Sequence, residues 1–166
     1  MTYSSRIIDE HDEEKLQKML EKCDDFFQLI FSRNAKEFEA KETLTELPKD
    51  KNYEDKFVIG IFDINLEIIG VVDIIRDYPE KNIWFLGLMI FCPEVRNNGL
   101  GKKVFDDTEE WALDLGADFI RLAVVEQNKK GYNFWKKLGF KDIKVKQDKL
   151  EGIDTNLIIM EKSLKI

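Results

Sequence analysis

The segment best suited to bind a charged ligand is a glycine-rich turn at residues 96–102. It reads Arg-Asn-Asn-Gly-Leu-Gly-Lys and follows the apolar run of residues 83–91 almost directly. Because glycine lacks a Cβ, Gly99 and Gly101 allow a backbone with positive φ and the close approach of a ligand. The helix expected to begin here would offer free N–H groups and the positive end of its dipole. Such an arrangement binds pyrophosphate.

The glycine pair also has a plainer explanation, which is close packing of the helix against the preceding strand. The turn matches neither the GxxxxGK[ST] spacing of nucleoside-triphosphate-binding loops nor the GxGxxG spacing of dinucleotide-binding folds. These mismatches disfavour a nucleotide kinase and a Rossmann-type dehydrogenase.

Two carboxylates are candidates for accepting a proton near this turn. Asp73 interrupts the apolar run of residues 68–75, and Glu126 follows the apolar run of residues 119–125. A carboxylate can accept a proton from a reacting group, either directly or through water. The plainer interpretations are a solvent-facing strand position for Asp73 and an exposed loop end for Glu126.

Apolar periodicity predicts the elements that must position these residues. Helices are expected over residues 13–30, 38–47, 99–115 and 129–138, and strands over residues 57–64, 68–75, 83–91, 119–125, 140–145 and 157–160. The first two strands read as an antiparallel hairpin, whereas strand–helix–strand order after residue 83 implies parallel pairing. Residues 83–91 are almost wholly apolar, so we expect a central strand buried on both faces. A mixed α/β sheet covered by helices is the predicted outcome.

Length and charge restrict the possible partners. The 166 residues fit one domain, predicted to span residues 1–166. Asp and Glu number 33 against 26 Lys and Arg, a formal net charge of −7. This balance argues against a general nucleic-acid binder and favours a cationic small partner.

Cysteine and histidine content and the chain's apolar runs indicate the compartment. Cys23 and Cys92 cannot form a disulfide framework, and with the single His11 they offer no zinc-ligand set, so we expect no metal. His11 lies in a charged stretch and is expected to be exposed. The first residues lack the apolar segment typical of a signal peptide, and no run approaches about 20 apolar residues, so we expect neither a signal peptide nor a membrane span. We predict a cytoplasmic protein without a membrane partner.

Two motifs carry a resemblance to a known family. Residues 96–101 resemble the [RQ]xxGx[GA] motif of the GNAT superfamily of acyl-CoA-dependent N-acetyltransferases. Residues 128–140 are similar to its second signature, an Asn followed by a helix that ends in [YW]-x-K-x-G-F. The motifs occur in the family's order, and the resemblance covers nearly the whole chain. Residues 73–79 and 84–88 resemble a bacterial branch of the superfamily.

The resemblance implies the GNAT fold, with a mixed, mostly antiparallel central sheet, helices on both faces and a splayed pair of parallel strands that form the CoA cleft. It implies acetyl-CoA as cosubstrate and direct acetyl transfer to a primary amine in a ternary complex, by a monomer or homodimer. Backbone groups at the end of strand 83–91 would pair with pantetheine and polarise the thioester carbonyl. The residues so assigned to the cofactor are Met89, Ile90, Phe91, Arg96, Asn97, Asn98, Gly99, Leu100, Gly101, Lys102, Asn128 and Trp135.

Departures from the family pattern affect the catalytic residues. Many GNAT enzymes have a tyrosine acid where this chain has Trp135, and an indole N–H is no acid near neutral pH. Tyr132, one helical turn earlier, is a possible substitute. Strand 83–91 lacks the carboxylate base common in the superfamily, so the candidate catalytic residues are Asp73, Glu126 and Trp135. The alternative function is a non-catalytic acyl-CoA-binding sensor or partner protein. Asn128 is equally explained as a helix N-cap.

Overall fold

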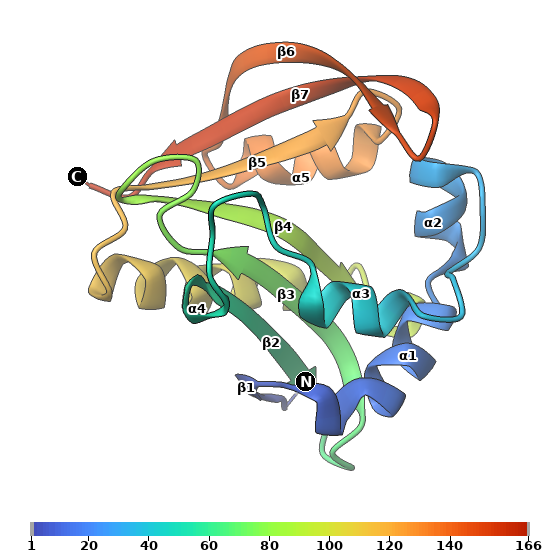
Figure 1. Cartoon of the computed structure of the whole chain (residues 1–166). Helices are drawn as coiled ribbons and strands as arrows, with labels where there is room; N and C mark the ends of the chain where they lie inside the picture. Colours follow the sequence, from blue (N-terminus) through green and yellow to red (C-terminus); the bar gives the residue numbers. More distant parts are fainter. Residues whose placement is uncertain (1, 166) are drawn as a thin grey trace.

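A seven-stranded sheet organises residues 2–165, the part of the chain that this computed structural model describes (Figure 1). The strand order is β1-β2-β3-β4-β5-β7-β6, and every neighbouring pair is antiparallel except β4 and β5. The strands are β1 (Ser4–Ile7), β2 (Lys56–Phe62), β3 (Ile68–Ile75), β4 (Ile83–Phe91), β5 (Phe119–Val125), β6 (Lys141–Leu150) and β7 (Ile153–Ser163). The predicted mixed, mostly antiparallel sheet is therefore confirmed.

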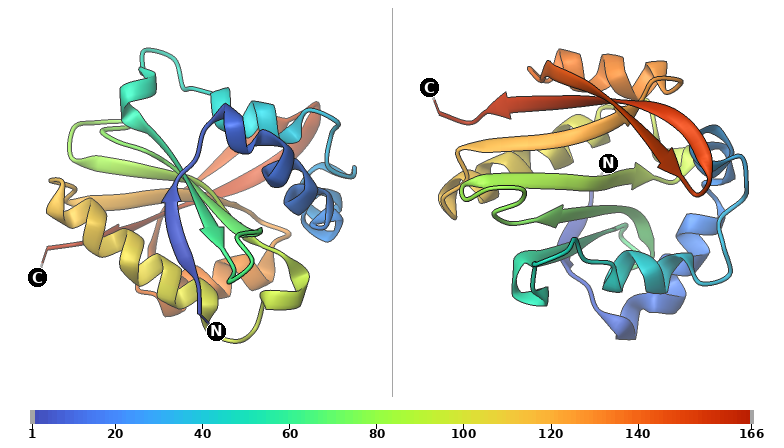
Figure 2. Two further views of the ribbon diagram at one scale, coloured as in Figure 1. Left: turned by 90° about the horizontal axis from the view of Figure 1, so that it is seen from below. Right: turned by 45° about the horizontal axis from the view of Figure 1, so that its top comes forward.

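Helices cover both faces of the sheet, as expected. One face carries α1 (Glu13–Glu21), α2 (Asp24–Phe31) and α3 (Glu39–Thr45), and the other carries α4 (Leu100–Asp114) and α5 (Lys129–Lys137) (Figure 2). Short 3-10 turns complete the set at Glu10–Asp12, Tyr53–Asp55 and Pro93–Val95. No helix within residues 2–165 is long and apolar enough to span a bilayer.

The prediction of one helix over residues 13–30 was wrong, because the helix breaks between α1 and α2. Cys23 has φ −101° and ψ 31°, and its N–H bonds to the carbonyl of Leu20 instead of continuing the α-helical pattern. The apolar stripe nevertheless stays buried across the break, from Leu16 through Cys23 to Phe27. Periodicity thus identified the buried face but not the change in axis.

The termini of α4 agree with the glycine positions in the sequence. Gly99 precedes the helix with φ 85°, and Gly116 follows it with φ 104°, the left-handed conformation that glycine adopts without strain. Trp111 of α4 packs against Phe57 of β2 and Trp84 of β4. The three rings form an aromatic cluster with ring centroids 5.0–5.7 Å apart. This cluster anchors the helix whose first turn faces the candidate site.

Two parts of the sheet were not predicted in full. The four residues of β1 are all exposed, so they show no apolar alternation that could reveal a strand. Strands β6 and β7 are much longer than their apolar segments, because hairpin pairing continues through charged residues to Leu150 and Ile153. Strand β6 is charged and mostly exposed, and the hairpin turns through Gly152, which has φ 83°.

Candidate functional site

A gap opens in the middle of the sheet where β4 and β5 part. The two strands pair over only three residues each, from Ile83 opposite Phe119 to Phe85 opposite Arg121. Beyond this point β4 stays with β3, and β5 stays with β7. The gap therefore widens toward the carboxyl ends of both strands, as their courses in Figure 1 show. The splayed parallel pair expected from the resemblance is present.

The expectation that β4 is buried on both faces was wrong for the middle of the strand. Gly87 is exposed, and Leu88 and Met89 are only half-buried. Since Asp73 pairs with Leu88 and Ile74 with Leu86, Gly87 has no partner on β3 and forms a β-bulge. The strand is apolar yet open here because β5 has moved away and no longer covers it.

The edge of β4 that faces the gap is available to an extended ligand. Met89, Ile90 and Phe91 pair with β3 on one side, and none of the described strands pairs with them on the other, although the Phe91 carbonyl already accepts from Arg96. Free backbone donors and acceptors on a strand edge bind an extended chain as an added strand. Their assignment to pantetheine stays a prediction.

The glycine-rich turn lies at the end of β4 and contains two left-handed residues. Asn97 has φ 63° and Gly99 has φ 85°, and the side-chain oxygen of Asn98 accepts a hydrogen bond from the N–H of Leu100 at 3.2 Å. Left-handed residues within such a turn direct backbone N–H groups into a concavity that suits an anion. No heavy atom lies within 4 Å of the position a Cβ on Gly99 would occupy. The geometry fits a pyrophosphate cradle at Gly99.

Packing does not require a glycine at position 101. A Cβ at this position would lie 3.4 Å from the Phe134 ring and 3.7 Å from the Phe91 ring, which are ordinary van der Waals contacts. The first turn of α4 lies against α5 and the end of β4 here with room for a small side chain. Lys102, one residue further, is exposed, and its ammonium lies 2.6 Å from the Asp106 carboxylate.

The side chain of Arg96 binds protein groups. Its Nε donates to the carbonyl of Phe91 at 2.8 Å, and its two terminal nitrogens lie 2.5 and 3.3 Å from the carboxylate of Asp25. The guanidinium lowers the pKa of Asp25. Arg96 therefore ties the turn to the end of β4 and to α2, while direct contact of its side chain with the cofactor stays a prediction.

The second motif builds α5 beside the gap. Asn128 is the N-cap of this helix, since its side-chain oxygen accepts from the N–H of Gly131 at 3.0 Å, and a pantetheine contact stays a prediction. Trp135 is half-buried, with its ring edge-on to Phe105, Phe134 and Phe140 at centroid distances of 5.6, 4.8 and 5.3 Å. These contacts suit an aromatic wall.

The hydrogen bonds of the Tyr132 hydroxyl do not support a role as the general acid that Trp135 cannot supply. It donates to both carboxylate oxygens of Asp142 on β6, at 2.9 and 3.1 Å. This hydrogen bond raises the pKa of Tyr132 above its ordinary value. The phenol proton is therefore held at β6.

Asp73 is not the solvent-facing residue that the plainer interpretation expected. Its side chain is only 16% exposed, and both carboxylate oxygens bind the ammonium of Lys56, at 3.0 and 3.1 Å. Lys56 is itself 3% exposed. One carboxylate oxygen lies 3.8 Å from the position a Cβ on Gly87 would occupy. The carboxylate thus faces the bulge at the gap.

The pKa of Asp73 is raised above its ordinary value. Burial is the main cause, the ammonium of Lys56 opposes it, and the carboxylate of Glu46 at the end of α3 adds to it. A carboxylate with a raised pKa is a stronger proton acceptor than an ordinary one. Sequence analysis missed both Lys56 and Gly87; the glycine within an apolar strand was the available signal for the bulge.

Glu126 has the exposed position that its plainer interpretation expected. Its N–H donates to the carbonyl of Asn156, and its carboxylate accepts from the Asn156 side chain, both at 2.9 Å. It contributes to an open polar hollow at the end of β5, beside the β6–β7 hairpin. A catalytic role for Glu126 stays a prediction.

The two cysteines and the histidine lie outside this chemistry. Cys23 and Cys92 are buried, and burial raises the pKa of both thiols, that of Cys23 to about 12. His11 is exposed as expected. Residues 2–165 contain no group of three or more His, Cys, Asp or Glu side chains placed to hold a metal ion.

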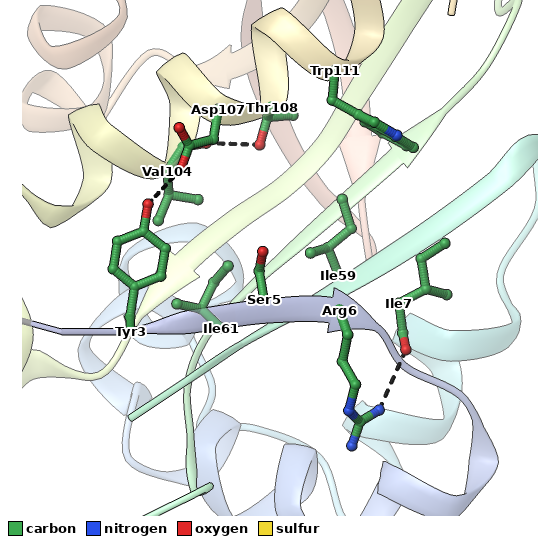
Figure 3. Close-up of a pocket in the computed structure, with 10 residues that line it drawn as sticks. All are labelled: Tyr3, Ser5, Arg6, Ile7, Ile59, Ile61, Val104, Asp107, Thr108 and Trp111. Carbon is green, nitrogen blue, oxygen red and sulfur yellow. Dashed lines mark hydrogen bonds between the residues drawn. The ribbon is translucent and has the colours of Figure 1, made fainter. Parts of the chain in front are cut away.

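A separate hollow of about 260 Å³ lies between β1, β2 and α4 (Figure 3). The hydroxyl of Tyr3 donates to Asp107 across it, and burial together with this carboxylate raises the pKa of Tyr3 to about 12. In the strand order, β3 and β4 lie between this hollow and the gap. This hollow is therefore not part of the candidate cofactor site.

Comparison with known proteins identifies the family. Residues 17–140 match the sequence profile of the acetyltransferase (GNAT) family. The chain belongs to this family. The matched span includes β4, β5, the glycine-rich turn between them and the whole of α5.

Individual relatives agree with this membership. The thialysine N-epsilon-acetyltransferases of Sus scrofa and Bos taurus are 43% and 41% identical to this GNAT chain over 66 residues. Each match covers 40% of this chain and only 38% of the relative.

Solved structures confirm the GNAT fold over almost the whole chain. An acetyltransferase from Thermus thermophilus has a TM-score of 0.78 at 21% identity, covering 98% of this chain and 97% of its own. A spermidine N-acetyltransferase from Vibrio cholerae, solved with CoA and spermine, has a TM-score of 0.76 at 16% identity, covering 98% of this chain and 95% of its own. At these identities the likeness establishes the fold.

Replacing Gly99 tests the pyrophosphate cradle. Gly99→Leu and Gly116→Leu each place a side chain at a left-handed position with free space around it, and each should cost about 1–2 kcal/mol of stability. Acetyl-CoA at about a hundredfold excess over Kd should stabilise wild type and Gly116→Leu by about 2.7 kcal/mol. Gly99→Leu should lose this gain in thermal unfolding with and without acetyl-CoA. An equal gain in all three proteins would contradict the cradle.

Removing the cation beside Asp73 tests the buried pair. Lys56→Met should lower the free energy of unfolding at pH 7 by about 3–5 kcal/mol, because it leaves the Asp73 carboxylate buried and unpaired. Without the ammonium, the pKa of Asp73 in the folded state rises further above its value in the unfolded chain. The loss of stability should therefore shrink on acidification, because the folded state binds a proton at Asp73. Urea unfolding at pH 7 and pH 5 measures both effects. The double variant with Asp73→Asn should recover much of the stability; a loss independent of pH would argue against the pair.

Proposed function

We propose that this GNAT protein transfers an acetyl group from acetyl-CoA to a primary amine of a small molecule or of a peptide or protein acceptor, by direct attack within a ternary complex. The observation that carries the proposal is the gap between β4 and β5, which has a free strand edge on one side and the glycine-rich turn at its end. Acetyl-CoA, when bound, supplies the acetyl group as an activated thioester.

The residues of the gap fit a CoA molecule. Backbone N–H groups of residues 97–102 would bind the pyrophosphate in the space left open at Gly99. The free edge of β4 at Met89–Phe91 would pair with pantetheine and present an N–H to the thioester oxygen. Asn128 and Trp135, on the opposite side of the gap, would line the cofactor arm.

Asp73 is the stronger of the two candidate bases. It faces the bulge at Gly87, and its raised pKa favours taking a proton from the acceptor ammonium, directly or through water. Glu126 is the second candidate, at the carboxyl end of β5. The formal net charge of −7 is in keeping with a cationic amine as the acceptor.

The departing thiolate has no obvious acid among the described residues near the gap. Trp135 supplies only an indole N–H and Tyr132 is bound to Asp142. A thiol of pKa about 8.5 is a fair leaving group without help. We propose that catalysis depends on positioning the amine and on the backbone donors of β4 rather than on an acid.

The second candidate function is a non-catalytic acyl-CoA-binding protein. Trp135 in place of the family's tyrosine and the absence of an ionisable side chain on β4 favour it. The names of the relatives, which include thialysine and spermidine acetyltransferases, favour the enzyme. Release of free thiol from acetyl-CoA with a panel of primary amines distinguishes the two.

Substitution of the two carboxylates identifies the base. Asp73→Asn should lower kcat/KM by about 10²–10⁴ while the Kd of acetyl-CoA stays nearly unchanged, because the cofactor contacts are made by backbone groups. Glu126→Gln, which removes a charge from an exposed residue, should have a smaller effect. Steady-state thiol release and cofactor titration supply both quantities. Near-wild-type rates for both variants would exclude a carboxylate base at these two positions.

Trp135 gives a contrasting prediction. Trp135→Phe keeps an aromatic ring against Phe105 and Phe140, so kcat should fall less than about tenfold. Trp135→Ala should instead lower the free energy of unfolding by about 3–5 kcal/mol, since it leaves a cavity in this cluster. Thiol release and urea unfolding of the two variants test this. A hundredfold fall in kcat for a stable Trp135→Phe protein would mean that the indole N–H takes part in catalysis.

A further inference from the structure

An ion-pair bridge joins two distant parts of the chain, the segment after α2 and the tip of the β6–β7 hairpin. Arg33, just after α2, donates to both carboxylate oxygens of Glu151 at the tip of the β6–β7 hairpin, at 2.6 and 2.7 Å. The two residues are 118 positions apart in the sequence. We call this contact the Arg33–Glu151 bridge.

The bridge is held firmly on its α2 side. A terminal nitrogen of Arg33 donates to the Glu39 carboxylate at 3.1 Å and to the carbonyl of Asn34 at 2.9 Å. The guanidinium also lies 4.7 Å above the Phe31 ring. Arg33 is only 22% exposed. Bidentate, partly buried Arg–carboxylate pairs of this kind are among the stronger ion pairs, because several donors are fixed at once.

The hairpin extends past the end of β5 to reach this position. Strand β7 pairs with β5 only from Leu157 onward, opposite Val125, so residues 147–156 project beyond the gap's β5 side. On the β4 side, α2 is attached through Asp25 to Arg96. Three connections thus form a closed ring around the open end of the gap. The end of β4 is joined to α2 by Arg96, α2 is joined to the hairpin by the Arg33–Glu151 bridge, and the hairpin is joined to β5 by strand pairing.

The face on which the ring lies indicates which ligand it affects. The glycine-rich turn begins α4, on the face covered by α4 and α5, whereas the bridge joins the hairpin to the α2–α3 connection on the opposite face (Figures 1 and 2). Glu46, whose charge acts on Asp73, ends α3 on that same opposite face. The cofactor and the bridge thus occupy different sides of the sheet, and the acceptor side is the one enclosed.

We infer that the Arg33–Glu151 bridge restricts the acceptors of this protein to small, slender amines and excludes lysine side chains on folded proteins. The inference rests on the proposed function and narrows its acceptor class. An amine on a thin aliphatic chain can pass through an enclosed opening, whereas a folded protein cannot follow its lysine side chain past the ring. Opening the ring should therefore relax the choice of acceptor without changing the cofactor site.

Spermidine and folded cytochrome c, a lysine-rich protein, serve as test acceptors. Wild type should acetylate spermidine with a kcat/KM at least a hundredfold above that for cytochrome c, and Glu151→Gln should reduce this ratio at least tenfold by accelerating the protein reaction. Asp154→Asn is the matched control, because it breaks the Lys149–Asp154 pair within the same hairpin and leaves the bridge intact. An unchanged ratio in Glu151→Gln, or equal use of both acceptors by wild type, would overturn the inference.

A labelling experiment decides the same question without catalysis. A Cβ on Gly87 makes only ordinary contacts of 3.7 and 3.8 Å, so Gly87→Cys places a thiol in the gap, while the native cysteines are buried. With desulfo-CoA bound, N-ethylmaleimide should react readily and fluorescein maleimide slowly. Adding Glu151→Gln should raise the fluorescein rate at least tenfold, and Asp154→Asn should not. Equal rates of labelling by fluorescein maleimide with and without the bridge would refute the inference that the bridge encloses the gap.

The thiol-release assay tests the proposed function separately. Failure of every amine to release thiol from acetyl-CoA would refute the proposed function, whatever the labelling rates.

Discussion

The short pairing of β4 with β5 is the constraint on which the rest of the site depends. A sheet normally satisfies the backbone groups of its central strands by pairing on both sides. Here β4 loses one neighbour after Phe85, and its edge and its bulge at Gly87 become accessible in the middle of the protein. The glycine-rich turn begins where this edge ends, so the unpaired strand edge and the left-handed turn lie next to each other.

Ion pairs hold the surroundings of the gap in place. Arg96 ties the turn to α2, the Arg33–Glu151 bridge ties α2 to the hairpin, and Lys56 holds Asp73 at the bulge. The first two pairs join segments that are distant in sequence and that share no strand pairing across the gap. These contacts add to the aromatic packing between α4 and α5 in holding the elements around the gap together.

Much of the site could be predicted because it consists of local backbone geometry. Gly99 is needed where φ is positive, and a glycine before an amphipathic helix indicates this directly. Asn128 likewise acts within its own helix turn. The environment of Asp73 could not be predicted, because its cation comes from another strand and the facing space comes from a glycine on a third. The burial of β4 was overestimated for a similar reason, since apolar composition cannot show where a neighbouring strand diverges.

The sequence by itself determined the α/β class, the limits of β4 and β5, the glycine ends of α4 and the family motifs, since each depends on residues close together in the chain. The tertiary structure alone decided which charges meet. Glu151 lies in a charged hairpin, and nothing near it in sequence points to Arg33. Ion pairs over such separations depend on where the sheet places its strand ends. For this protein, that arrangement makes Asp73 a buried carboxylate at the gap and joins the tip of the β6–β7 hairpin to the residue after α2.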